Sequence, residues 1–155
     1  MNHEERAVAL FKQGYNCSQS VFAAFSEELG MDQETALKIS SSFGGGMGRL
    51  REVCGAVSGM FMVLGLKEGY TDPNDGSLKA QHYQKVQELA KKFEQENGSI
   101  VCRELLGLNQ KHDSPVPEAR TKSYYKKRPC AELVGMAAKF LDEFFEKENQ
   151  KGSSL

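Results

Sequence analysis

The sequence lacks the features that define several classes of protein. Its four cysteines are too few for a disulfide-dense secreted scaffold, and its 155 residues allow one domain to bury a core without disulfide staples. With 20 Lys+Arg against 21 Asp+Glu, the net charge of −1 gives no electrostatic basis for binding nucleic acid or an anionic membrane. The composition also excludes a disordered chain, a collagen and a repeat solenoid. A compact domain remains, with four thiols to explain.

No segment has the pattern of a signal peptide or the length of a membrane span. Residues 1–6 are polar and acidic, unlike a secretory leader. The longest uncharged apolar run, 53–66, is shorter than the roughly 20 residues that cross a bilayer. We therefore expect a cytoplasmic protein without a membrane or nucleic-acid partner, in which this run forms a buried helix.

Helical periodicity recurs along most of the chain, and no alternating run of β-branched residues reaches the length of a strand. Asn16 and Asp32 have the side chains of good helix N-caps. We predict an all-α single domain over residues 1–147, a bundle of six or seven helices around a buried central helix, with a disordered tail over 148–155. The proline-containing segment 108–129 is expected to be irregular. The predicted helices cover 3–13, 17–29, 33–42, 51–66, 77–96, 100–106 and 130–147.

A glycine-rich run at 44–48 is predicted to be a loop, because four glycines in five positions would strongly destabilise a helix. It lacks the Gly-Lys-Ser/Thr ending of a phosphate-binding loop and does not follow a strand. Arg49 and Arg51 beside it could hold a small anion, although a close-packing turn that shapes the cysteine site is the favoured interpretation. Gly55 and Gly59 lie one helical turn apart and would let another backbone approach closely.

The cysteines are far apart in the sequence and form no Cys-x-x-Cys pair, so neither a thioredoxin motif nor a zinc knuckle is present. Each nevertheless falls near a predicted helix start, where free N–H groups and the helix dipole favour a thiolate. A lone buried cysteine is usually core filler, but filler has no reason to prefer first turns. We therefore predict that Cys17, Cys54, Cys102 and Cys130 converge on one site.

The segment from Cys54 to Gly59 reads C-G-A-x-x-G, and it is preceded by Phe43-Gly44-Gly45-Gly46-Met47-Gly48. With Asn16-Cys17-Ser18 upstream and Cys102-Arg103-Glu104-Leu105 and Cys130 downstream, the chain resembles the C_GCAxxG_C_C family over roughly residues 4 to 145. These small proteins are described as redox-active and occur largely in anaerobic prokaryotes. The resemblance implies a helical protein whose four cysteines act together, as a dithiol/disulfide system or as ligands to a metal or iron–sulfur centre.

A related four-cysteine domain accompanies haem in some multi-cofactor cytochromes, which favours an iron–sulfur centre. No Cys-x-x-Cys-His is present, so covalent haem is not expected. Four thiolates satisfy the ligand count of an iron–sulfur cluster or of tetrahedral zinc, and ligands drawn from distant helices are unusual for structural zinc.

The leading hypothesis is a redox or electron-transfer protein that binds a metal or iron–sulfur centre; the sequence does not decide whether it is an enzyme. The expected ligands, or redox thiols without a metal, are Cys17, Cys54, Cys102 and Cys130. The expected cofactor-binding glycines are Gly44, Gly45, Gly46, Gly55 and Gly59. The alternatives are a thiol–disulfide redox protein and a non-catalytic helical scaffold with buried cysteines. A redox partner protein is expected but not identified, and a homo-oligomer is left open.

A basic run with two tyrosines, 122–128, resembles a nucleic-acid contact, but the balanced charge favours a solvated loop. Its residues 126–128 are expected to help hold Cys130 as a thiolate. His112 beside Asp113 resembles part of a catalytic dyad, yet the sequence provides no nucleophile to pair with it, so hydrolase chemistry is not supported.

Overall fold

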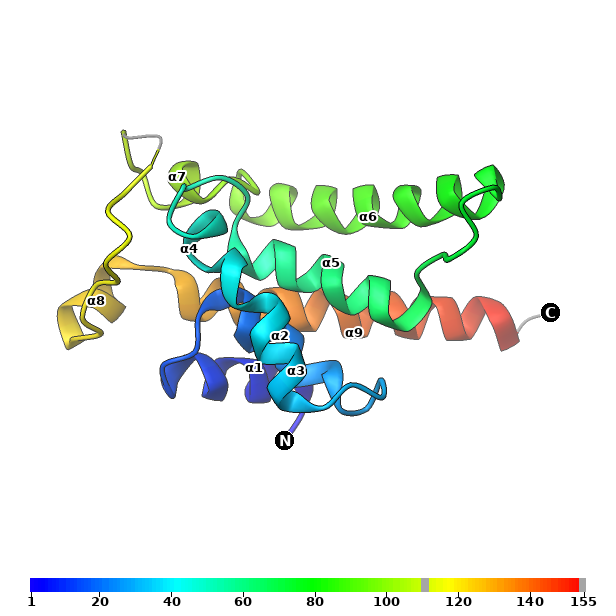
Figure 1. The fold of residues 1–155 in the computed structure, drawn as a ribbon, viewed down its shortest axis with the longest axis horizontal. Coiled ribbons are helices and arrows are strands. Elements are labelled where there is room, and N and C mark those ends of the chain that lie inside the picture. The colour runs from blue at the N-terminus through cyan, green and yellow to red at the C-terminus, as the bar shows by residue number, and fades with distance from the viewer. Residues whose placement is uncertain (110–111, 154–155) are drawn as a thin grey trace.

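The computed structural model describes residues 1–109 and 112–153, and helices account for most of them (Figure 1). No strand occurs in this described part of the chain, so the predicted all-α fold is confirmed. The elements are α1 (His3–Lys12), α2 (Cys17–Ser26), α3 (Gln33–Ser40), the 3-10 turn η1 (Ser41–Phe43), α4 (Gly44–Met47), α5 (Gly55–Glu68), α6 (Gly76–Asn97), α7 (Cys102–Leu105), α8 (Lys122–Lys127) and α9 (Cys130–Ser153).

Side-chain caps fix several helix starts where the sequence places them. The Asn16 side chain accepts a hydrogen bond from the Gln19 backbone N–H, and the Asn16 backbone N–H donates one to the Gln19 side-chain oxygen, which completes a capping box on α2. Asp32 caps α3 in the same way, through the Thr35 N–H. The capping box fixes the position of Cys17, which is the first residue of α2.

The core forms around α5, which packs against α2, α6 and α9 (Figure 1). Val57, Met60 and Leu64 of this helix are completely buried, and burying an apolar side chain of this size contributes about 1.5–3 kcal/mol. A Cβ atom at Gly59 would stand 2.8 Å from the Ser18 carbonyl oxygen, so this glycine sets how closely α5 approaches α2. No helix of the described residues is both long enough and apolar enough to cross a membrane.

Some element boundaries differ from the prediction for identifiable reasons. The chain over 51–54 is not helical, because Val53 forms an isolated antiparallel bridge with Val101. One short helix, α8, forms inside the segment expected to be irregular, capped by Thr121. The last helix continues to Ser153, past the predicted end at 147, and Lys85 of α6 pairs with Glu148 at 2.9 Å. The predicted disordered tail is thus helical over 148–153; residues 154–155 lie outside the described residues.

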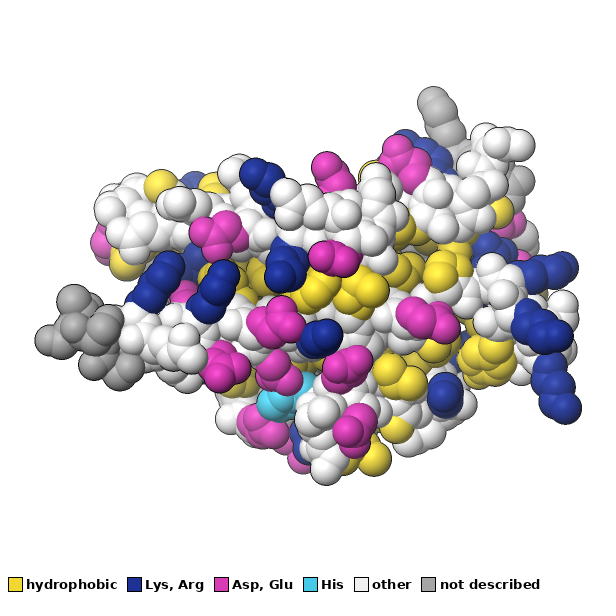
Figure 2. All heavy atoms as spheres, turned by 180° about the vertical axis from the view of Figure 1, so that it is seen from behind, with side chains coloured by type: hydrophobic (Ala, Val, Ile, Leu, Met, Phe, Trp, Pro, Cys, Tyr) yellow, Lys and Arg dark blue, Asp and Glu magenta, His cyan; other side chains and the backbone are white. Residues whose placement is uncertain are grey.

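Charged side chains of both signs are interspersed over the face shown in Figure 2, as expected from the balanced composition. Basic side chains gather at the end of the molecule where α8 lies, and apolar side chains show in the seam below α6. The lysines at 122, 126 and 127 are exposed, in agreement with the interpretation of this run as a solvated surface.

Candidate functional site

Each of the four cysteines lies at a helix start, as the sequence predicts. Cys17, Cys102 and Cys130 are the first residues of α2, α7 and α9. Cys54 is the N-cap of α5. All four thiols are free. Three of these helices are long enough to present a helix dipole, whose positive end favours negative charge on sulfur.

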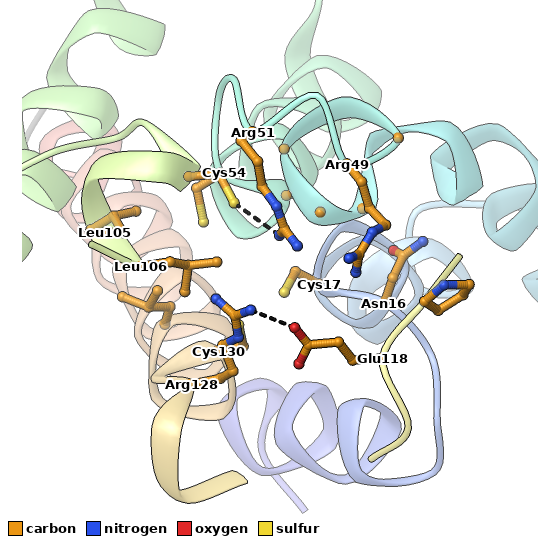
Figure 3. Close-up of a pocket in the computed structure, with 18 of the residues that line it drawn as sticks. Asn16, Cys17, Arg49, Arg51, Cys54, Leu105, Leu106, Glu118, Arg128 and Cys130 are labelled. Atoms are coloured by element: carbon orange, nitrogen blue, oxygen red, sulfur yellow. Dashed lines mark hydrogen bonds and ion pairs between the residues drawn. The ribbon is translucent and has the colours of Figure 1, made fainter. Parts of the chain in front are cut away.

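The four cysteines line one cavity of about 290 Å³ between the start of α2, the glycine-rich turn and the start of α9 (Figure 3). Arginine is the other prominent residue type in its wall: four arginines line the cavity and Glu118 is the one acidic residue among the lining residues. The lining arginines are Arg49, Arg51, Arg120 and Arg128. Nucleophilic sulfur therefore shares the cavity with a surplus of positive charge.

Cys17 and Cys130 form the first of two thiol pairs, here called the helix pair because each residue begins a long helix. Both side chains are half-buried. The Cys17 thiol donates a hydrogen bond to the Cys130 sulfur, which lowers the pKa of Cys130 to about 7 and raises that of Cys17 well above its ordinary value. The positive charge of Arg128 and a hydrogen bond from Tyr124 also lower the pKa of Cys130. The pair therefore consists of one thiolate and one thiol near neutral pH.

Cys54 and Cys102 form the second pair, here called the bridge pair because they follow the two bridged valines. The Cys54 N–H donates to the Ile100 carbonyl at 2.8 Å, which brings the starts of α5 and α7 together. The two thiols are only 5% and 7% exposed. Burial raises both pKa values, that of Cys54 to about 12. At Cys102 the Arg51 guanidinium, 3.6 Å from the sulfur, opposes that rise.

The glycine-rich run, predicted to be a loop and most simply a close-packing turn, forms one tight turn, α4. Gly45 and Gly46 have φ of 69° and 72°, values that glycine adopts freely, and the Gly48 N–H donates to the Gly44 carbonyl at 2.9 Å. A Cβ atom at Gly46 would stand 2.6 Å from the Cys102 Cβ, and one at Gly44 would overlap the Asn16 side chain. The turn thus lies directly against two residues of the site.

Arg49 and Arg51 follow this turn and also have positive φ, 67° and 60°. A residue with a Cβ atom is less stable in this conformation by about 1–3 kcal/mol. Both side chains point into the cavity (Figure 3), and both pair with Asp113 at 3.2 Å. The chain therefore accepts backbone strain at two positions whose guanidinium groups, paired with Asp113, line the cavity.

The segment 112–121 crosses beside the cavity and is attached to it by polar contacts. Glu118 pairs with Arg128 at 2.7 Å, and Arg120 donates hydrogen bonds to the carbonyls of Phe11 and Tyr15. The Arg120 guanidinium also stacks on the Phe11 ring, 4.1 Å from its centroid. Sequence reasoning missed this frame, because each contact joins residues far apart in the chain and no local pattern marks it.

The predicted cofactor-binding glycines separate into two groups. The cavity is lined by Gly44, Gly45, Gly46 and Gly55, whereas Gly59 is absent from its wall and lies at the contact between α5 and α2. A Cβ atom at Gly55 would stand 3.0 Å from the Cys17 Cβ, so this glycine allows Cys17 its position. None of these contacts tests whether the glycines bind a cofactor.

The cysteine side chains are not arranged as a metal centre in the part of the chain that the structure describes. Across residues 1–109 and 112–153, no group of three or more Cys, His, Asp or Glu side chains is arranged to hold a metal ion. Cys102 instead faces Arg51, and Cys17 is hydrogen-bonded to Cys130. The four thiols as they stand therefore do not fit a four-cysteine metal cage.

Comparison with known proteins gives a family match. A family model described as "Putative redox-active protein (C_GCAxxG_C_C)" matches residues 15–144, which include all four cysteines. No curated protein and no solved structure matches the chain.

Proposed function

The chain belongs to the C_GCAxxG_C_C family, and from this membership and the geometry of the cavity we propose that it is a thiol–disulfide redox protein. Cys17 and Cys130 are the reacting pair. The observation that carries the proposal is that the starts of α2 and α9 bring both half-buried sulfurs to one cavity, where each shifts the pKa of the other. A dithiol that is to close into a disulfide needs this proximity.

The proposed reaction reduces a disulfide and oxidises the helix pair. The Cys130 thiolate attacks one sulfur of the substrate disulfide, so that a Cys130–substrate bond forms and the other substrate half leaves as a thiolate. The Cys17 thiol then loses its proton to solvent and attacks the Cys130 sulfur. This forms the Cys17–Cys130 disulfide and releases the second substrate half. Two protein thiols have become one disulfide, and the substrate disulfide has become two thiols after protonation by solvent.

The surroundings of the two sulfurs support this division of roles. Thiolate, not thiol, is the nucleophile, and Cys130 has the lower pKa, at about 7. In the resting pair Cys17 stays protonated, because its interaction with the Cys130 sulfur raises its pKa. A dithiol reductant is needed to return the helix pair to the reduced state, so we expect a redox partner of that chemical class.

A metal or iron–sulfur centre is the second candidate, favoured by the fact that all four thiols line the same cavity. Cys17, Cys54, Cys102 and Cys130 would be its ligands. This candidate requires the cysteine side chains to turn away from the contacts described above, because three of them do not meet at one point in the described residues.

Disulfide mapping after equilibration in dithiothreitol redox buffers tests the proposal. Protein purified without oxygen is equilibrated, its free thiols are blocked, and its peptides are identified by mass spectrometry. We expect one disulfide, joining Cys17 and Cys130, and its unaltered formation in the matched variant Cys54→Ser. Absence of this disulfide at oxidising ratios overturns the proposal. Stoichiometric iron or zinc bound by the protein as purified, and lost in Cys54→Ser, supports the metal centre instead.

A further inference from the structure

The charge of the cavity wall indicates which class of substrate the cavity would bind. Four arginines and one carboxylate line it, and Arg49 and Arg51 point from the glycine-rich turn toward the sulfurs (Figure 3). Asp113 and Glu118 pair with three of these arginines from the segment 112–121. One carboxylate, Asp113, thus serves two guanidinium groups, and positive charge remains in excess around the thiols.

Arg51 is the residue in this wall with an unused hydrogen-bonding group. Its side chain is 5% exposed, and its two terminal nitrogens contact the Cys102 sulfur and Asp113. Its Nε is buried and has no hydrogen-bond partner. A buried donor without an acceptor is less stable by about 1–3 kcal/mol, so an acceptor supplied by a ligand would be favoured here.

The size of the cavity limits what the acceptor can belong to. Its volume of about 290 Å³ lies at the lower end of the range for small-molecule sites. The reactive thiols of Cys17 and Cys130 are half-buried, and contacts of Glu118 and Arg120 hold the segment 112–121 beside them. A compact molecule fits this space better than a folded protein surface.

We propose that the cavity selects a small anionic disulfide, with a negatively charged group of the substrate bound by Arg51 and its sulfur–sulfur bond presented to Cys130. This inference rests on the proposed function. The bonds that form and break are those already given: the Cys130–substrate bond replaces the substrate disulfide, and Cys17 then displaces the bound half. The substrate would thus be selected by its negative charge, which the Arg51 guanidinium binds.

Three disulfides of nearly equal length test the charge preference: dithiodiglycolate, 2-hydroxyethyl disulfide and cystamine, which are anionic, neutral and cationic. The reduced protein is mixed with each, and the rate of Cys17–Cys130 disulfide formation is measured. Each rate is divided by that of dithiothreitol with the same compound, which removes the intrinsic reactivity of the disulfide. We expect the normalised rate of the anion to exceed that of the neutral compound by about tenfold, which corresponds to about 1.4 kcal/mol. The cation should react slowest, because the arginines of the cavity repel it.

The variant Arg51→Gln should bring the normalised anion-to-neutral ratio close to one. The ratio is the informative readout, because any change in the reactivity of Cys130 affects both compounds alike. Lys126→Gln, at an exposed position outside the cavity wall, is the matched control and should keep the wild-type ratio. If Arg51→Gln fails to fold, the wild-type anion advantage must shrink as salt is raised, since charge recognition is screened.

The two proposals fail in different ways. Reduction of all three compounds at equal normalised rates, or an unchanged ratio in folded Arg51→Gln, overturns the inference about substrate charge and leaves the thiol–disulfide function standing. If none of the compounds is reduced and the Cys17–Cys130 disulfide never forms, the proposed function itself is wrong.

Discussion

The helix pair and the bridge pair face the same cavity from different kinds of support. Cys17 and Cys130 begin two long helices and are half-buried, and their interaction lowers the pKa of Cys130 and raises that of Cys17. Cys54 and Cys102 are almost fully buried beside a backbone bridge, and burial raises the pKa of both thiols. Position at a helix start therefore does not by itself activate a thiol. At Cys130 the interaction with Cys17 and the charge of Arg128 outweigh the effect of burial on the pKa, whereas at Cys54 burial prevails.

Replacing the helix pair should have the largest effect. Cys130→Ser removes the attacking sulfur, so we expect complete loss of disulfide reduction, whereas Cys17→Ser should stop the reaction at a mixed disulfide between Cys130 and the probe. Mass spectrometry of the intact protein after exposure to 2-hydroxyethyl disulfide distinguishes the two outcomes. Cys102→Ser is the control from the bridge pair. Equal loss in Cys102→Ser would erase the proposed difference between the pairs.

Alkylation with iodoacetamide compares the pairs without mutation. Because the pKa of Cys130 is lowered to about 7, its thiolate is present above that pH and declines as the pH falls through it. Cys54, with a pKa of about 12 and a buried side chain, stays protonated throughout this range. At pH 7 we expect Cys130 to react at least about 100-fold faster than Cys54. Peptide mapping at a series of pH values gives both rates; similar rates would contradict the contrast.

We expect the glycine-rich turn to stabilise the fold around Cys102 more than it affects the reaction of Cys17 and Cys130. In Gly46→Ala the new Cβ atom meets the Cys102 Cβ at 2.6 Å and the Arg51 Cα at 2.8 Å, at a φ of +72°. We expect the free energy of unfolding to fall by about 3 kcal/mol, measured by urea denaturation.

Gly14→Ala is the control for Gly46→Ala, since its φ is +113° but nothing lies within 4 Å, and it should lose only about 1 kcal/mol. The folded fraction of Gly46→Ala should still form the Cys17–Cys130 disulfide. A loss no greater than that of Gly14→Ala would show that the turn does not press on Cys102.

The smallest effect is expected from the charge beside Cys130. Arg128→Gln removes a positive charge that lowers the pKa of Cys130, so the midpoint of alkylation should move to higher pH and the rate at pH 7 should fall about threefold. The hydrogen bond from Cys17 remains and limits the change. Lys126→Gln serves as the control of equal charge change, and an equal shift in both variants would mean that the effect is not local.

Much of the site was predictable because its position depends on local signals. Asn16 and its capping box fix the start of α2, and Pro129 precedes the start of α9, so two cysteines could be placed at helix starts from short patterns. The influence of Arg128 on Cys130 was also predicted, from two positions of separation. The four-residue error at the start of α5 arose where a long-range bridge between Val53 and Val101 overrides helix periodicity.

The rest depends on contacts that no local pattern records. Asp113 was recognised only as the neighbour of His112, whereas its partners are Arg49 and Arg51, far back in the chain. The sequence likewise placed all four cysteines at helix starts but did not distinguish the pairs, because the hydrogen bond between Cys17 and Cys130 depends on how α2 and α9 pack. Pairing, rather than placement, was the missing information.

The positive φ angles of Arg49 and Arg51 set stability against function in this protein. Glycine would adopt these conformations without strain, so Arg49→Gly or Arg51→Gly relaxes the backbone while it removes a guanidinium from the cavity. The two positions of backbone strain are thus positions that supply charge to the cavity, through side chains that also pair with Asp113. Selection for relaxed backbone geometry alone would favour glycine here and would leave the cavity with two of its four arginines.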